Sequence, residues 1–370
     1  MSKKIKLLCR KCSVLIVFLL FLQGSQAQND FNKVENWINA NLEDLGGRAV
    51  MVVYKDGKII FNKAKNGMTA RKKFAARFIA KRQGKDPSEF TRDFSSKSKI
   101  AIASCSKWLS AALVMTFVDE GKLSLEDSVG KFLPAMTKNG KGGIKIWQCL
   151  SHLTGIKSGS LRESLKEMKE VNSMDEAIEK IAQQPFESEP GKTFRYSNTG
   201  LQIAGAILEK ISGKSFQDLF IERIAKPCDM KNTDFGRGKV ALPAGGAYGT
   251  ADDYLKFLEM ILNDGRYNRK EVLSKASVIK MQQNYAKDAR VVYSPAEALN
   301  WGYGFGEWVM EDATERSRAV TSPGLFGSFP WIDNERKYAA VLFCFNLKNE
   351  GRGEKYKRLK ELVDDAIAKM

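Results

Sequence analysis

The sequence predicts an α+β fold, in which one antiparallel sheet flanked by helices is built from both chain ends and a mostly helical lobe is inserted between them. Strand-like patterns concentrate near the two ends, whereas residues 122–290 are mostly helical by pattern. Strands need a shared sheet and core, so we expect the two ends to pair. The predicted division is a signal peptide at 1–27 and a single domain at 28–370, with an α/β lobe at about 28–103 and 291–370 and a helical lobe at about 104–290.

The composition excludes some classes of protein. Hydrophobic residues make up 43% of the 370 residues and charged residues 28%, which is typical of a globular protein with a large core. The single histidine, His152, excludes a zinc hydrolase that needs several imidazole ligands. A Ser-His-Asp triad could use only this residue, and its position just before Thr154-Gly155 favours a turn-stabilising role over that of a base. Nucleophilic chemistry in this chain is therefore expected to use another base.

The N-terminus has the layout of a secretory signal peptide. Five basic residues precede the nine-residue apolar run Val14–Leu22, and Ser25-Gln26-Ala27 supplies the small residues of a cleavage site. Nine apolar residues are too few to span a bilayer, which needs about 20. A cleaved signal is therefore favoured over an uncleaved anchor, and we expect an exported protein, periplasmic or extracellular.

Four cysteines lie beyond the signal peptide, at spacings that match no metal site. Export permits disulfides, but apolar neighbours favour small buried thiols over bridges. The three cysteines with such neighbours are Cys105, Cys149 and Cys344; the fourth is Cys228.

A basic amphipathic helix is predicted in a charged insertion at residues 63–99, because cations surround Phe74, Phe78 and Ile79. Without the signal peptide the formal net charge is +12, which favours acidic partners. Two interpretations stay open: a solvated helix face with a few buried aromatics, or a peripheral contact of the basic segment 71–85 with an anionic envelope surface. Because the charge is spread through an exported chain, no nucleic-acid partner is expected. The cations are Arg71, Lys72, Lys73, Arg77, Lys81, Arg82 and Lys85.

Periodicity and turn residues predict the other elements. The helices are residues 30–43, Ser106–Glu120 closed by Gly121, a helix through Leu262 with Thr250 and Asp253 as its capping box, and Glu354–Lys369. The strands are Arg48–Tyr54 and Lys58–Asn62, joined by a Lys55-Asp56-Gly57 turn, and strand-rich segments at Trp301–Met310, Ala319–Ile332 and Lys337–Asn346.

Ser104 and Lys107 are the candidate nucleophile and base. Ser-x-x-Lys occurs four times, but only Ser104 stands at the start of a long apolar helix. Residues three apart share a helix face, so the Lys107 amine can reach the Ser104 hydroxyl. A desolvated neutral lysine can take the hydroxyl proton, and N–H groups at the helix N-terminus favour developing negative charge. A helix-capping serine with a chance lysine is the alternative.

The second motif is Tyr196-Ser197-Asn198, the only Tyr-x-Asn in the chain. It lies in a predicted loop before a helix at Leu201–Ser212. A tyrosine beside cationic side chains can have its pKa lowered and act as a base or proton shuttle. Asn198 can bind Lys107 or a substrate amide. A buried tyrosine that caps a turn is the structural alternative.

The third motif is Ser322-Pro323-Gly324-Leu325. Glycine lets the backbone approach a ligand closely at a sheet edge. The Leu325 N–H could then pair with the Ser104 N–H as an oxyanion hole. The substrate pocket is expected to use the helical lobe and the loop around residues 285–300.

Taken together and in this order, the three motifs resemble those of the serine β-lactamase and penicillin-binding superfamily, most closely the class C β-lactamase-like group with its esterases and D-aminopeptidases. The resemblance covers most of the mature chain and extends to Val118–Asp127, Leu150–Ile156, Pro190–Gly200 and Ala244–Leu258. It implies a β-lactamase/transpeptidase-like fold.

The resemblance also implies roles for the motif residues. Ser104 would be acylated, Lys107 and Tyr196 would share proton transfer, and Asn198 would orient Lys107 and substrate. The family usually has Lys-Thr-Gly or His-x-Gly at the third motif, where this chain has Ser322. The missing cation or imidazole favours a small ester or peptide-like amide over a β-lactam.

The sequence therefore predicts an exported serine hydrolase with a small-molecule or peptide-like acyl substrate and neither metal nor organic cofactor. Ser104, Lys107 and Tyr196 are its predicted catalytic residues. Asn198, Ser322, Gly324 and Leu325 are the predicted supporting or substrate-binding residues. The alternatives are a non-catalytic or weakly catalytic penicillin-binding-like protein that binds cell-envelope ligands, and an acyltransferase.

Overall fold

The computed structural model describes residues 31–82, 86–159, 163, 170–236, 238–346 and 350–370. The predicted signal peptide lies outside these residues. No helix in the described part of the chain is both long and apolar enough to cross a membrane. The four cysteines beyond the signal peptide are buried free thiols, as predicted for Cys105, Cys149 and Cys344.

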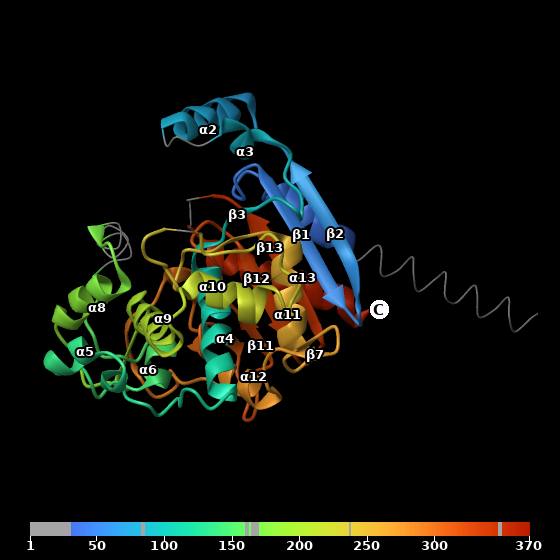
Figure 1. Ribbon diagram of the computed structural model, residues 1–370. Coiled ribbons are helices and arrows are strands. Elements are labelled where there is room, and N and C mark those ends of the chain that lie inside the picture. The colour runs from blue at the N-terminus through green and yellow to red at the C-terminus, as the bar shows by residue number, and fades with distance from the viewer. Residues whose placement is uncertain (1–30, 83–85, 160–162, 164–169, 237, 347–349) are drawn as a thin grey trace, which may run out of the picture.

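The centre of the molecule is a seven-stranded antiparallel sheet to which both ends of the chain contribute (Figure 1). Its order is β2-β1-β13-β12-β11-β10-β9, and the first strand pairs with the last from Ala49 opposite Cys344 to Lys55 opposite Tyr338. The predicted sharing of one sheet is confirmed. The strands are β1 (Arg48–Lys55), β2 (Lys58–Asn66), β9 (Gly302–Tyr303), β10 (Trp308–Glu311), β11 (Ala319–Thr321), β12 (Phe329–Asp333) and β13 (Tyr338–Cys344).

The predicted hairpin at the start of the sheet is confirmed. Asp56 and Gly57 have φ angles of +49° and +78°, which is the left-handed backbone that a two-residue hairpin turn requires. β2 continues four residues past its predicted end, because β1 offers pairing partners as far as Arg48 opposite Asn66.

Alternation along the strands gives the sheet two apolar faces. Ala49, Met51 and Val53 face one core, which the helix at residues 31–40 and α13 (Arg352–Ala368) cover. Val50 and Val52 face the other, larger core. Helices therefore cover both faces, and three layers result.

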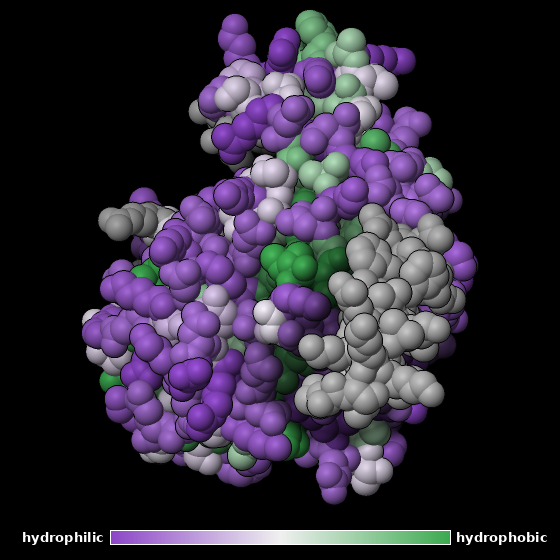
Figure 2. Space-filling model, turned by 90° about the vertical axis from the view of Figure 1, so that its right-hand side faces the viewer, coloured by the Kyte–Doolittle hydropathy of each residue, from purple (hydrophilic) through white to green (hydrophobic). Residues whose placement is uncertain are grey.

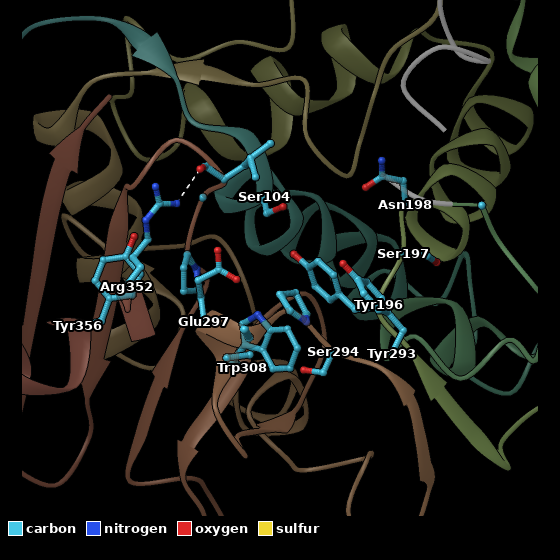
Figure 3. Close-up of a pocket in the computed structure, with 17 residues that line it drawn as sticks. Ser104, Tyr196, Ser197, Asn198, Tyr293, Ser294, Glu297, Trp308, Arg352 and Tyr356 are labelled. Carbon is cyan, nitrogen blue, oxygen red and sulfur yellow. Dashed lines mark hydrogen bonds between the residues drawn. The ribbon is translucent and has the colours of Figure 1, made fainter. Parts of the chain in front are cut away.

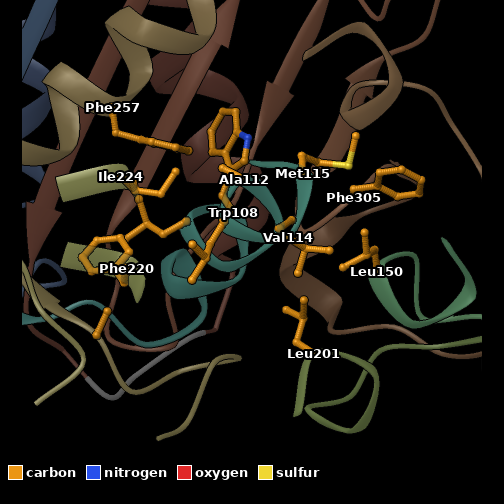
Figure 4. Close-up of a cluster of buried hydrophobic side chains, with 14 of the residues drawn as sticks. Trp108, Ala112, Val114, Met115, Leu150, Leu201, Phe220, Ile224, Phe257 and Phe305 are labelled. Carbon is orange, nitrogen blue, oxygen red and sulfur yellow. The ribbon is translucent and has the colours of Figure 1, made fainter. Parts of the chain in front are cut away.

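The larger core is organised by two helices, α4 (Ser106–Asp119) and α11 (Ala251–Leu262). α11 packs on the sheet although it falls within the expected helical lobe, and α4 lies beside it, with Trp108 edge-on to Phe257 at 5.9 Å between ring centroids (Figure 4). Residues Ser106–Phe117 of α4 are all buried. This helix therefore joins the sheet to the helical lobe, and its predicted end at Gly121, with φ +66°, is confirmed.

The helical lobe surrounds α9 (Thr199–Ser212), which packs against α4 and three other helices. α9 ends at Gly213, whose φ of +68° is that of a C-terminal glycine. The lobe's helices are α5 (Pro134–Lys138), α6 (Ile146–Leu150), α8 (Met174–Gln183), α9 (Thr199–Ser212) and α10 (Phe216–Phe220), which continues as a π-helical turn at Ile221–Ala225, and α12 (Lys275–Met281) lies near the end of α4.

Short elements connect the two lobes. The parallel pair β4–β8 joins the helical lobe to the loop before the C-terminal strands, and β3–β5 lies next to the start of α4. These elements are β3 (Ile100–Ala101), β4 (Thr193–Arg195), β5 (Tyr248–Gly249), β6 (Arg266–Tyr267), β7 (Lys270–Glu271), β8 (Arg290–Tyr293) and the 3₁₀ turns η1 (Ala103–Cys105), η2 (Val129–Lys131) and η4 (Ala296–Ala298).

Lys360 links α13 to the sheet through ion pairs. Its amine lies 2.9 Å from Glu311 on β10, 3.0 Å from Asp333 on β12 and 2.8 Å from Asp364 on its own helix. Lys360 and Asp333 are almost fully buried, so each charge depends on the other.

We expect Lys360→Met to lower the free energy of unfolding by about 3 kcal/mol, because it leaves carboxylates without their buried cation. Urea denaturation measures this change. Lys357→Met, at an exposed position on the same helix, is the control, with an expected change within about 0.5 kcal/mol. Equal stability of the two variants would contradict the role assigned to the ion cluster.

Candidate active site

Ser104 lies on η1, immediately before α4, and its side chain borders a cavity. The preceding Ala103 has φ +46°, a strained conformation for a residue with a side chain. Close packing holds this turn: a Cβ on Gly324 would lie 2.4 Å from the Ile102 carbonyl oxygen. The third motif therefore needs its glycine so that its backbone can lie against the turn that carries Ser104.

Lys107 is fully buried one turn further along the chain, where its amine faces three oxygen atoms. Its Nζ lies 3.3 Å from Ser104 Oγ, 3.2 Å from Asn198 Oδ1 and 2.7 Å from the Ala244 carbonyl oxygen. Burial lowers the pKa of Lys107 to about 7. A substantial fraction of the amine is therefore neutral near pH 7 and able to accept a proton.

Tyr196 and Asn198 come from the segment between β4 and α9. The Tyr196 hydroxyl points toward Ser104 (Figure 3), and its ring lies 4.8 Å from Lys107 Nζ and stacks on Trp308 at 5.1 Å. Burial raises the pKa of Tyr196, although the Ser104 hydroxyl opposes this shift. The expected lowering of this pKa is wrong, because the phenol is enclosed while the neighbouring amine is itself desolvated. Tyr196 is therefore a neutral proton donor and acceptor, not a standing phenolate.

The third motif lies between β11 and β12, where its residues divide into two groups. Ser322 is buried, with its hydroxyl 3.2 Å from the Ser104 carbonyl oxygen and 3.0 Å from that of Gly306, and it does not line the cavity. Gly324 and Leu325 do line it. The Leu325 N–H has no hydrogen-bond partner in the described part of the chain, so it remains available to a ligand.

The cavity next to Ser104 has a volume of about 250 Å³. Its described lining contains one acid, Glu297, which points toward the middle of the cavity, and one cation, Arg352 (Figure 3). Arg352 donates to the carbonyl oxygens of Leu325, at 2.7 Å, and Asn346, at 3.0 Å. The described lining residues are Ser104, Gly159, Tyr196, Ser197, Asn198, Tyr293, Ser294, Pro295, Ala296, Glu297, Ala298, Trp308, Pro323, Gly324, Leu325, Arg352 and Tyr356.

The structure thus brings the first two motifs together around one amine and places two residues of the third motif beside them. Residues 293–298 line the cavity, so the predicted contribution of the loop around 285–300 is confirmed. Sequence reasoning did not find Glu297, Arg352 or Trp308, because none of them belongs to a local motif. Arg352 begins α13 and reaches the cavity only through the packing of that helix.

His152 lies behind the site. Its ring contacts the Tyr196 ring at 4.7 Å, and its Nε2 lies 3.0 Å from the Tyr303 hydroxyl. Its φ is +61°, and burial holds its pKa well below the usual range. The residue is therefore a neutral imidazole in a tight turn that does not line the cavity, in agreement with the predicted turn-stabilising role.

The pKa of Lys107 predicts how any reaction in which this amine takes the Ser104 proton depends on pH. Below about pH 7 the amine is protonated and cannot take the Ser104 proton, so kcat/KM should fall about 10-fold per pH unit and level off above pH 7. Asn198→Asp would place a carboxylate 3.2 Å from the amine, favour its charged form and move the midpoint to higher pH.

A pH series with a chromogenic ester measures both profiles. Ser294→Ala, which alters another serine of the cavity, is the control and should keep the midpoint. A midpoint that does not move in Asn198→Asp would contradict the assignment of the profile to Lys107.

Known proteins are similar to this chain over most of its length. Protein Rv1367c of Mycobacterium tuberculosis (strain ATCC 25618 / H37Rv) is 27% identical over 285 residues, which cover 62% of this chain and 71% of that protein. A crystal structure from Bacteroides dorei DSM 17855 superposes with a TM-score of 0.76 at 27% identity, covering 91% of this chain and 99% of that one. EstCE1, a hydrolase with promiscuous acyltransferase activity, has the same fold, with a TM-score of 0.70 at 20% identity over 92% and 99% of the two chains.

The match to a family model agrees with these likenesses and with the predicted resemblance. The Beta-lactamase model matches residues 38–364, a span that includes every residue of the three motifs. The chain belongs to the Beta-lactamase family.

Proposed function

We propose that the protein is an exported serine hydrolase that cleaves an ester or amide through an acyl-enzyme on Ser104. The observation that carries the proposal is the buried Lys107 amine, which lies 3.3 Å from the Ser104 hydroxyl and has a pKa of about 7. A serine needs an adjacent base to become a nucleophile at neutral pH, and a desolvated lysine meets that need.

Acylation begins when Lys107 Nζ takes the hydroxyl proton and Ser104 Oγ attacks the substrate carbonyl carbon. The Ser104 and Leu325 N–H groups stabilise the resulting oxyanion. Collapse of the tetrahedral intermediate breaks the ester or amide bond. Tyr196 donates a proton to the leaving oxygen or nitrogen and regains one from the Lys107 ammonium, so the proton balance closes. Water then attacks the acyl-enzyme with the same groups in reverse order and releases the acid.

The cavity favours a small ester or peptide-like amide over a β-lactam. Its walls are mainly apolar, and the third motif offers a buried Ser322 where the family usually places a cation or imidazole. The Arg352 guanidinium donates to the backbone carbonyl oxygens of Leu325 and Asn346. EstCE1 acts as a hydrolase with acyltransferase activity, which supports the proposed acyl chemistry and keeps transfer to an alcohol or amine as a second outcome of deacylation.

The rival function is a non-catalytic or weakly catalytic protein that binds cell-envelope ligands. Ser322 favours it, because that side chain turns to the backbone and supplies no charged group for catalysis. A lysine buried against a serine opposes it, since burial of an ionisable amine is costly and a binder has no need of a base.

A fluorophosphonate probe tests the nucleophile directly. We expect a single covalent adduct on the wild type, seen by intact mass, and none on Ser104→Ala, because the Ser104 hydroxyl borders the cavity and lies beside the buried Lys107 amine. Ser294→Ala, a serine of the same cavity, is the control and should keep the adduct. A folded wild type that forms no adduct would favour the binding protein.

Tyr196→Phe tests the proton transfer to the leaving group. We expect kcat to fall by about 10²–10⁴-fold, which is the usual contribution of general acid–base catalysis, with little change in melting temperature. Tyr293→Phe removes another phenol that lines the cavity and should affect kcat far less. Full activity in Tyr196→Phe would remove this residue from the mechanism.

A further inference from the structure

Helix α2 (Ala70–Arg82) projects from the body of the molecule beside the edge of the sheet (Figure 1). With α3 (Pro87–Thr91) it forms an excursion between β2 and β3. The base of the excursion is pinned, because Asn66 at the end of β2 accepts from the Phe94 N–H at 2.6 Å and donates to the Phe94 carbonyl oxygen at 3.1 Å. No described side chain of α2 belongs to the hydrophobic core clusters, so this helix is not needed to close the core.

Two aromatic side chains of α2 face solvent. Phe74 is 74% exposed and Phe78 is 57% exposed, and residues four apart lie on the same face of a helix. The interpretation of a solvated helix with buried aromatics fails for this pair. Figure 2 shows apolar residues among hydrophilic ones on this projection. Ala80, by contrast, is fully buried.

The charge on the same helix is entirely positive. α2 contains six basic residues and no acid in 13 positions. Lys72 pairs with Glu43 at 3.3 Å. The other basic side chains have no carboxylate partner in the part of the chain that the structure describes: Arg71, Lys73, Arg77, Lys81 and Arg82. Lys85, the last residue of the predicted basic segment, lies outside that part.

We propose that α2 docks the protein on an anionic lipid membrane. An interfacial helix places apolar side chains at the boundary between headgroups and acyl chains and directs lysines and arginines to the headgroups. Phe74 and Phe78 supply the apolar contact, and the unpaired cations supply the attraction to anionic lipid. A soluble polyanion would bind the cations but would make little apolar contact with the two phenyl rings. The exposed pair therefore favours a lipid surface over a soluble polyanion.

The proposal does not depend on catalysis. α2 contributes no residue to the described lining of the cavity, so membrane binding and hydrolysis would use different residues. Variants of α2 should therefore separate membrane binding from hydrolysis.

The test is sedimentation of the purified protein with vesicles of phosphatidylcholine alone or mixed with phosphatidylglycerol. We expect binding only to the anionic vesicles, and at least about 10-fold weaker binding by both Phe74→Ser/Phe78→Ser and Lys73→Glu/Arg77→Glu. Any contribution from residues 1–27 is the same in every variant, so it cancels in the comparison.

The matched controls remove similar groups elsewhere. Ile59→Ser alters an exposed apolar residue of the hairpin, and Lys138→Glu/Lys357→Glu alters two exposed lysines far from α2 in sequence. Both controls should bind as the wild type does, and all variants should keep the wild-type melting temperature and ester hydrolysis.

Three results would overturn the proposal. The first is no binding of the wild type to anionic vesicles. The second is unchanged binding by Phe74→Ser/Phe78→Ser. The third is equally tight binding of wild type and this double variant to a soluble sulfated glycan that competes with the vesicles, which would identify the partner as a polyanion.

Discussion

The site depends on keeping water away from the Lys107 amine. Exposed to solvent, this amine would have a pKa near 10.5 and would be protonated at neutral pH; burial brings the pKa to about 7. That burial needs segments that are distant in the chain, because α4 supplies the lysine while the segment before α9 and the turn at Ala244 supply its oxygen partners. The fold therefore encloses the Lys107 amine beside the Ser104 hydroxyl.

The enclosure costs stability elsewhere in the site. Ala103 adopts a left-handed φ, and Gly324 must lack a side chain so that the backbone can approach within contact of η1. Packing around α4, which is buried along almost its whole length, holds this arrangement in place. An active site under local strain is stable only because the surrounding core determines its geometry.

Both lobes also contribute to the lining of the cavity. The helical lobe brings Tyr196 and Asn198, whereas the sheet side brings Leu325, Trp308 and Arg352. The parallel pair β4–β8 ties these contributions together, since Tyr196 directly follows β4 and the loop that carries Glu297 follows β8. Substrate selectivity is therefore expected to follow changes in this loop more than changes in the motifs.

The sequence by itself determined the local elements and the motif residues. Apolar periodicity, the Asp56-Gly57 turn and the helix end at Gly121 depend on neighbouring residues, so they could be recognised without a structure. The family motifs could be recognised in the same way, because each consists of a few neighbouring residues. Only the tertiary structure decided the properties that depend on residues distant in the chain. In the cavity, these are the raised pKa of Tyr196 and the positions of Arg352 and Glu297 in the lining. Outside it, they are the burial of Ser322 and the exposure of Phe74 and Phe78. Burial and long-range contact are set by the packing of whole elements, and no local pattern encodes them.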